Sequence, residues 1–186
     1  MPVTKRTRGV TRDEWLGAAL DELSFGSVTD INVQALARKL GIGKSGFYWH
    51  FRNKGELLRA VLEYWVHEIT EVITTNPQMQ ELDPETRLRK TAEMIVDYGL
   101  VRYEIGIRQW ALRDREAAKV FKRVNTLRLN YTRETLAELG FEGDDLEMRA
   151  MAFVCYHTWE VLMFRDMSRK KLRGLIRQRV EMICRK

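Results

Sequence analysis

Residues 44–50, near the N-terminus, bring together cationic, hydroxyl and aromatic side chains that suit contacts with a nucleic acid. If Phe47 and Phe51 turn inward, the other side chains lie on or beside one outer face. A solvated helix seldom exposes Tyr, Trp and His together. Lysine and serine can reach base edges or phosphates, and aromatic rings can pack on a thymine methyl or a sugar. We therefore predict recognition of a duplex groove by Lys44, Ser45, Tyr48, Trp49 and His50.

Two short helices, at about residues 33–40 and 44–51, must position this face. Ala37 provides the small side chain that lets the two helices cross closely, and Gly41 provides a turn position where a positive φ is easy. This spacing predicts a helix-turn-helix. An ordinary helical hairpin would show the same apolar pattern. The prediction of DNA binding therefore depends on the polar residues that face outward. The shared core is predicted to contain Leu36, Leu40, Ile42, Phe47 and Phe51.

Further DNA contacts are predicted on both sides of the turn. Lys54 begins the next helix, where its ammonium and the free N–H groups of the helix end can hold one phosphate together. Asn32 is the expected N-cap of the first short helix, and Gln34 follows it. A flexible basic arm can add phosphate or minor-groove contacts through Lys5, Arg6 and Arg8.

The distribution of charge agrees with an acidic partner at the N-terminus. Residues 1–54 hold 9 Lys and Arg against 5 Asp and Glu, and residues 165–186 hold 9 against 2. The middle of the chain is acidic, and the formal net charge of the whole is +6. Basic segments attract phosphate-rich partners through counterion release, although composition alone does not separate nucleic acid from an anionic membrane surface.

Helix-period patterns dominate the chain, and no strand-period alternation of useful length occurs. We predict an all-α protein of about nine helices, in which an N-terminal three-helix helix-turn-helix domain (residues 1–52) is joined to a C-terminal helical bundle (residues 53–186). Thr11 and Glu14 have the spacing of a capping box at the start of the first helix. The expected helices are about 11–23, 33–40, 44–51, a long helix from 53, then 85–103, 106–113, 115–139, 145–166 and 169–184.

The run GIGKSGFYWHFRNKGELLRAVLEYW, Gly41–Trp65, resembles the signature of the TetR family of bacterial repressors. The shared features are the turn glycine, the aromatic cluster that ends in His50–Phe51, a lysine three residues later at Lys54, and a Leu-rich helix. With the flanking helices the resemblance covers about residues 11–65. A weaker similarity, from Ile107–Phe121 to Leu136–Phe141, resembles one group of C-terminal regulatory domains in that family.

The resemblance implies an Ω-shaped homodimer, a palindromic DNA operator and a C-terminal pocket whose small, largely apolar ligand releases the DNA. The predicted function is a cytoplasmic repressor that responds to a hydrophobic or aromatic ligand. The alternatives are a family member without a small-molecule inducer, controlled by a protein partner or acting as an activator, and a helical interaction module or enzyme that binds no DNA. One departure is Gly46, which stands where family members often carry a base-reading side chain. Readout is therefore expected to depend on Lys44, Ser45, Phe47 and Tyr48.

A dimer is also indicated by the size of the recognition helix, which buries too little surface to bind specifically alone. A twofold pair about 34–36 Å apart solves this problem. The last two helices carry apolar stripes that can pair with their copies. The last stripe could instead close the protomer's own core, or its basic helix could lie on an anionic membrane. The predicted interface is Met151, Val154, Cys155, Thr158, Leu162, Leu172, Leu175, Ile176 and Val180.

Aromatic residues are dense between Tyr98 and Phe164, and most such residues are core. A ligand pocket needs a similar lining with a few polar groups. The predicted pocket residues are Met94, Tyr98, Tyr103, Trp110, Phe121, Asn125, Tyr156 and Trp159.

Enzymatic chemistry has little support in the sequence, and no cofactor is expected. The three histidines lie far apart, and neither a phosphate-binding glycine loop after a strand nor a GxSxG motif is present. His157 and Cys155, two residues apart, face different sides of a helix and make a poor metal site. Cys155 and Cys184 are expected to be reduced thiols. No apolar run is long enough to span a membrane, and the basic N-terminus lacks the apolar run of a secretory signal.

Overall fold

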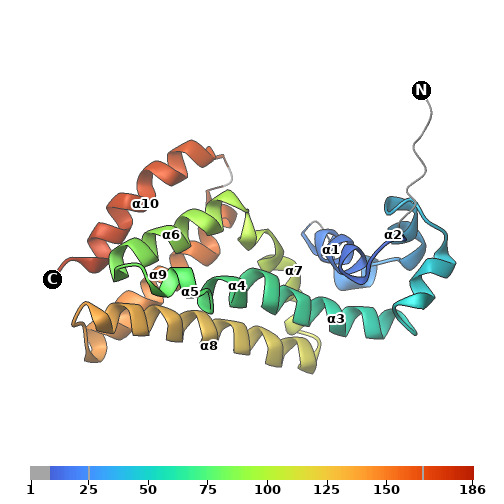
Figure 1. Ribbon diagram of the computed structural model, residues 1–186, viewed down its shortest axis with the longest axis horizontal. Coiled ribbons are helices and arrows are strands. Elements are labelled where there is room, and N and C mark those ends of the chain that lie inside the picture. Colours follow the sequence, from blue (N-terminus) through green and yellow to red (C-terminus); the bar gives the residue numbers. More distant parts are fainter. Residues whose placement is uncertain (1–8, 25, 165) are drawn as a thin grey trace.

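The computed structural model describes residues 9–24, 26–164 and 166–186, with the side chains of residues 161 and 162 excepted. It confirms the predicted all-α fold, since the described residues form helices and no strand. The molecule is elongated, with the N-terminal helices at one end and the C-terminus at the other (Figure 1). None of the described helices is both long and apolar enough to cross a membrane.

The N-terminal end contains α1 (Arg12–Leu23), a 3-10 turn η1 (Val28–Asp30), α2 (Val33–Lys39) and a second 3-10 turn η2 (Lys44–Trp49). The predicted capping box starts α1, because the Glu14 N–H donates to Thr11 Oγ1 at 3.2 Å and the Thr11 N–H donates to Glu14 Oε2 at 2.8 Å. A cap of this kind stabilises a helix by about 1 kcal/mol. The segment predicted as the second short helix is the 3-10 turn η2.

A long rod connects this end to the rest of the molecule, and it consists of α3 (Lys54–Val66), a π-helical turn η3 (His67–Glu71) and α4 (Val72–Thr74) (Figure 1). The rod has an apolar stripe, and its residues Leu57, Val61, Leu62, Trp65 and Ile69 are buried. The π turn then adds a residue and rotates the stripe, so Val72 is 40% exposed while Ile73 is buried. π turns of this kind occur often at functional sites.

The C-terminal bundle follows a short helix α5 (Pro77–Gln80). It consists of α6 (Pro84–Asp97), a 3-10 turn η4 (Leu100–Tyr103), α7 (Glu104–Ala111), α8 (Arg115–Glu138), α9 (Gly143–Met163) and α10 (Arg169–Cys184). The helix expected over 85–103 ends early because Gly99 adopts a left-handed conformation with φ +59°. In Figure 1, α8 runs alongside the rod, and α10 lies over α6.

Two hydrophobic clusters hold the chain together. The first joins α1, α2 and η2 to the rod and continues through Tyr103, Ile107 and Trp110 into α8, so it crosses the predicted boundary at residue 52. The second fills the space between α6, α8, α9 and α10. The rod therefore packs both on α1 at the N-terminal end and on α8 of the bundle.

Helix α1 and helix α7 approach so closely that only glycine fits at Gly106. A Cβ at this position would lie 2.2 Å from the Leu23 carbonyl oxygen. We expect Gly106→Ala to lower the free energy of unfolding by about 1–3 kcal/mol through overpacking. Urea denaturation followed by circular dichroism measures the change.

Gly174→Ala in α10 is the matched control. A Cβ there meets nothing within 4 Å. Replacing glycine with alanine inside a helix raises the free energy of unfolding by up to about 1 kcal/mol, so this variant should be as stable as the unaltered protein or more stable. Equal stability of the two variants would refute the close contact between α1 and α7.

Candidate nucleic-acid interface and ligand cavity

The recognition turn η2 is held in place by an aromatic cluster under its inner side. The Phe47 ring lies edge-on to Trp15 of α1, with 5.4 Å between ring centroids, and Phe51 lies 5.4 Å from Phe47. Leu36 and Ala37 of α2 complete this core. The predicted inward orientation of Phe47 and Phe51 is confirmed, since each is only 1% exposed.

The turn between α2 and η2 has the glycine geometry that the sequence predicts. Gly41 has φ +72°, a conformation that L side chains rarely adopt. The Ile42 N–H donates to the Ala37 carbonyl oxygen at 3.0 Å, which closes the end of α2. Because this turn is tight, η2 crosses close to α2 and presents one outer face.

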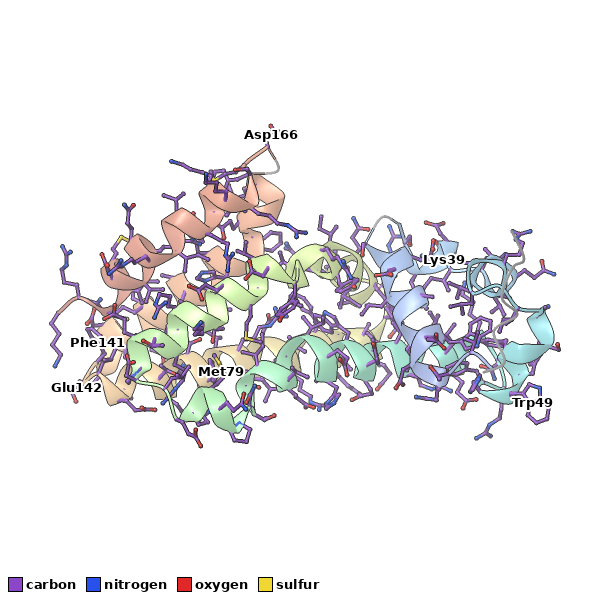
Figure 2. The ribbon with its side chains drawn as sticks, turned by 45° about the horizontal axis from the view of Figure 1, so that its top comes forward. Lys39, Trp49, Met79, Phe141, Glu142 and Asp166 are labelled. Atoms are coloured by element: carbon purple, nitrogen blue, oxygen red, sulfur yellow. The ribbon has the colours of Figure 1, made fainter. Side chains whose placement is uncertain are left out.

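Four of the predicted contact residues lie on that outer face with exposed side chains. Trp49 is 87% exposed and projects from the tip of the molecule in Figure 2, and Tyr48 is 57% exposed. The Tyr48 ring packs edge-on against Phe47 at 5.3 Å, and the Lys44 ammonium lies 6.0 Å from the Tyr48 ring centroid. Ser45 is also exposed. Large aromatic side chains left in water at this site are available to a partner.

Three other residues between Lys44 and His50 are buried or half-buried within the protein. The readout predicted for Phe47 is corrected, because a ring buried in the core cannot reach a base edge. Gly46 is half-buried, and a Cβ on it would lie 2.8 Å from Ile42 Cδ1, so the glycine lets η2 pack on the turn. His50 is half-buried rather than outward, with Nε2 2.9 Å from the Val10 carbonyl oxygen, and it fixes the start of α1.

Two of the flanking candidates, Asn32 and Lys54, make hydrogen bonds within the chain. Asn32 Oδ1 caps α2 by accepting from the N–H groups of Gln34 and Ala35 at 2.9 and 3.1 Å. Gln34 itself is exposed beside this cap. The half-buried Lys54 donates to the Thr29 carbonyl oxygen at 3.2 Å at the first position of α3. Lys5, Arg6 and Arg8 lie outside the described residues.

A cavity of about 50 Å³ lies between the rod, α6, η4, α8 and α9. Much of its lining is aliphatic or aromatic, from Ile69, Ile73, Ile95, Leu100, Val101 and Phe153. Its polar lining includes Thr70, Tyr131, His157 and Arg128. Apolar walls with a few converging polar groups are the usual form of a small-molecule site.

None of the eight predicted pocket residues lines this cavity. Trp110 belongs to the first hydrophobic cluster, and Phe121 stacks on Trp65 with 6.3 Å between centroids. Tyr156 and Trp159 instead lie under the guanidinium groups of Arg179 and Arg108, at 4.0 and 4.7 Å.

The remaining candidates also do not line the cavity. Met94, Tyr98 and Tyr103 line a neighbouring surface depression between α1, the rod, α6 and η4. Tyr103 donates its hydroxyl to Asp21 of α1 at 3.0 Å. Asn125 is half-buried on α8. The aromatic residues predicted for the pocket therefore lie outside the cavity wall.

The predicted dimer residues divide into two groups. Leu172, Ile176 and Val180 are corrected, because they are buried in the protomer's own second cluster, where α10 packs on α6. Val154 and Thr158 line the cavity. Leu175 is half-buried, and nothing is described for the Leu162 side chain.

The exposed part of the predicted interface lies on α9. Met151 and Cys155 are exposed there, as is Met148 one turn earlier. These positions follow one another at helical spacing, so α9 presents an apolar stripe to solvent in the protomer.

His157 is one of the cavity residues that the sequence did not predict, because a lone histidine on an apolar helix gives no motif. Its Nδ1 lies 2.7 Å from the Phe153 carbonyl oxygen one turn earlier, and its ring packs on Phe153 at 4.3 Å. Burial, with a smaller contribution from the charge of Arg179, lowers the His157 pKa to about 4, although the hydrogen bond to the Phe153 carbonyl opposes this shift. The ring is therefore neutral at pH 7.

Two ion pairs lie close to the cavity. Arg128 donates to Glu104 Oε1 at 2.6 Å, and its guanidinium lies 5.7 Å from the Trp65 ring centroid. Arg179 of α10 donates to Glu160 Oε2 of α9 at 3.0 Å, and both side chains are buried. Burial also raises the pKa of Tyr131, whose hydroxyl is 3.1 Å from Thr91 Oγ1.

The recognition segment matches known proteins. Residues 16–61 match the family described as bacterial regulatory proteins, tetR family. The HTH-type transcriptional regulator SrpR of Pseudomonas putida is 37% identical over 59 residues, which cover 32% of this chain and 28% of SrpR. The class A tetracycline repressor protein from transposon 1721 of Escherichia coli is 43% identical over 51 residues, covering 27% of this chain and 24% of that protein. The match thus spans about a quarter of each relative's length.

Solved structures extend the similarity of fold to nearly the whole chain. FadR of Bacillus subtilis, in complex with stearoyl-CoA, has a TM-score of 0.71 at 15% identity and covers 94% of this chain and 98% of its own. AibR, in complex with isovaleryl coenzyme A and operator DNA, has a TM-score of 0.68 at 18% identity. The match covers 92% of this chain and 96% of the AibR chain. In sequence, the N-terminal segment of the chain is thus similar to the TetR family of bacterial regulatory proteins.

The lowered pKa of His157 makes stability depend on pH. The unfolded chain binds a proton on this histidine below about pH 6.5, whereas the folded chain does so only near pH 4. The neutral His157 therefore contributes fully to the free energy of unfolding above pH 6.5, and this contribution is lost as the pH falls toward 4. The shift in pKa corresponds to about 3 kcal/mol of the free energy of unfolding.

His157→Phe removes this titration while keeping a ring against Phe153. We expect the free energy of unfolding of the variant to fall less steeply between pH 6.5 and 4 than that of the unaltered protein, as measured by urea denaturation at several pH values. The exposed His67 provides the control, because His67→Phe should leave the slope almost unchanged. Equal slopes for all three proteins would show that His157 is not held neutral by the fold.

Proposed function

We propose that the chain is a DNA-binding transcriptional regulator of the TetR family. It acts as a homodimeric repressor that releases a palindromic operator when a small, largely apolar ligand enters the cavity. The observation that supports DNA binding is the exposed face of η2. Its side chains Lys44, Ser45, Tyr48 and Trp49 lie around the buried ring of Phe47. Basic and aromatic side chains on a short recognition element match the contacts that proteins make with phosphates, sugars and thymine methyl groups.

The rod supports a coupling between the cavity and the recognition element. Its first residue, Lys54, contacts η1 beside the recognition element, and its last two turns provide Ile69, Thr70 and Ile73 to the cavity wall. A ligand that spreads the cavity displaces the end of the same rod whose beginning supports η2. DNA release then follows from a change in the spacing of two recognition elements.

A second contact leads from the cavity to α1. Leu100 and Val101 of η4 line the cavity. The next two residues, Arg102 and Tyr103, both donate to Asp21 Oδ1 of α1, at 3.3 and 3.0 Å. A shift of η4 on ligand binding therefore reaches the helix that packs directly on Phe47.

The size of the cavity limits the ligand. Pockets for drug-sized molecules have volumes of about 300–1,000 Å³, whereas this cavity has about 50 Å³. A ligand as long as the stearoyl-CoA bound by FadR would require the helices to separate widely. The compact cavity favours a small effector, or a state of the protein that is closed until the ligand enters.

The DNA face is tested by Tyr48→Ala. We expect this variant to bind the DNA upstream of its own gene about 5-fold to 150-fold more weakly, because a contact worth about 1–3 kcal/mol is removed, and to keep its melting temperature. Electrophoretic mobility shift and thermal denaturation measure the two quantities. Tyr98→Ala is the matched control, since Tyr98, the C-cap residue of α6, is also an exposed tyrosine and lies outside η2. Equal losses for both variants, or for neither, would contradict the assigned face.

The dimer is tested on the exposed stripe of α9. Met151→Glu places a charge in the proposed interface and should shift the protein from dimer to monomer, because an unpaired charge is costly to bury. Sedimentation velocity measures the mass. Leu112→Glu on the exposed end of α7 is the control and should remain dimeric. A monomeric unaltered protein, or a Met151→Glu variant that still dimerises, would remove α9 from the interface.

A further inference from the structure

The hydroxyl groups on the cavity wall present mainly lone pairs to the interior. Four of the lining threonines donate their hydroxyl hydrogens to carbonyl oxygens one helical turn earlier. Once a hydroxyl hydrogen is donated, the oxygen keeps its acceptor capacity. These bonds are Thr74 to the Thr70 carbonyl (3.1 Å), Thr91 to Arg87 (2.9 Å), Thr132 to Arg128 (2.8 Å) and Thr158 to Val154 (2.8 Å).

His157 adds the strongest acceptor. Because Nδ1 lies 2.7 Å from the Phe153 carbonyl oxygen, Nδ1 must carry the hydrogen, and Nε2 of the neutral ring must carry a lone pair. Nε2 is buried and has no hydrogen-bond partner among the described residues. A buried polar atom without a partner costs about 1–3 kcal/mol, so a ligand that supplies a donor here recovers that energy.

Thr70 offers the complementary group on the π turn of the rod. Its Oγ1 is buried and, within the described part of the chain, has no partner. Unlike the other four lining threonines, it has a hydrogen free to donate. Thr70 and His157 therefore give the cavity wall one free donor and one free acceptor, on two elements that face the same space.

The charges beside the cavity disfavour an anion. Arg128 lines the cavity, but its guanidinium is already paired with the buried Glu104 at 2.6 Å. Glu104 Oε2 is buried without a partner among the described residues, which adds negative rather than positive potential. A carboxylate entering this apolar space would lose its hydration without finding an unpaired cation.

We propose that the cavity binds a small uncharged molecule with an apolar body and a hydroxyl group, which donates its hydrogen to His157 Nε2 and accepts from Thr70 Oγ1. This inference rests on the ligand-responsive function proposed above and specifies the chemical class of that ligand. The aliphatic residues of the wall hold the apolar body, and the single acceptor–donor pair selects the hydroxyl. Ketones, which cannot donate, and carboxylates are discriminated against.

Three probes of similar size test the ligand class: 2-butanol, 2-butanone and butyrate. Ligand-observed NMR titration of the full chain measures their dissociation constants. We expect the alcohol to bind about threefold to tenfold more tightly than the ketone, the ratio that corresponds to one net hydrogen bond, and butyrate to bind most weakly. Equal binding of alcohol and ketone, preference for butyrate, or binding of none of the three would overturn the proposal.

Two variants assign the hydrogen bonds. His157→Phe should remove the preference for alcohol over ketone, whereas Thr70→Val should weaken both probes and keep the preference, because both can accept from Thr70. His67→Phe, outside the cavity, is the control and should change neither constant. Arg179 Nε and Nη2 are also buried without partners. If one of them satisfied His157, the alcohol would have no advantage, and the proposal would fail.

A mobility-shift assay on the same protein separates this proposal from the function on which it rests. If the protein binds its upstream DNA but shows no preference for the alcohol, the ligand class is refuted and the DNA-binding function stands. If it shows the preference but binds no DNA, the cavity chemistry stands and the regulator function is refuted.

Discussion

The burial of Phe47 between Trp15 and Phe51 is the interaction on which the rest of the structure depends. These rings turn the short 3-10 segment η2 so that its polar and aromatic side chains face outward. A turn of six residues has too few internal hydrogen bonds to be stable alone, so tertiary packing must hold it. The same cluster continues into the rod, which ties the orientation of η2 to the bundle.

The rod combines two tasks that most helices perform separately. Its beginning supports the recognition element and its end forms a wall of the cavity. The π turn at His67–Glu71 lies between these ends and changes the register of the buried stripe. A helix that is well packed along its length transmits a displacement rather than absorbing it, because protein interiors are close-packed. The π turn is the place along the rod where the helical hydrogen-bond pattern already departs from the regular one.

Many of the large aromatic residues of the bundle lie in different places from the residues that line the cavity. The large aromatic side chains fill the cores or lie under arginine guanidinium groups, as Tyr156 does beneath Arg179. The cavity wall consists mainly of aliphatic residues and threonines, together with Arg128, His157 and the two aromatic residues Tyr131 and Phe153. Small β-branched side chains leave space between helices that a larger ring would fill. The aromatic residues that the sequence predicted for a pocket lie outside this wall.

The sequence alone determined the features that depend on neighbours along the chain: the capping box at Thr11, the left-handed turn at Gly41, the helical fold and the inward Phe47 and Phe51. Local hydrogen bonds and helical spacing specify these features, so they can be read from a single stretch of residues. Only the tertiary structure decided that the α10 stripe packs on α6 within the protomer, that the predicted aromatic pocket residues lie elsewhere, and that His157 and Thr70 face one cavity. An amphipathic stripe shows which face of a helix is buried but not which surface covers it, because that choice depends on contacts between residues distant in the chain.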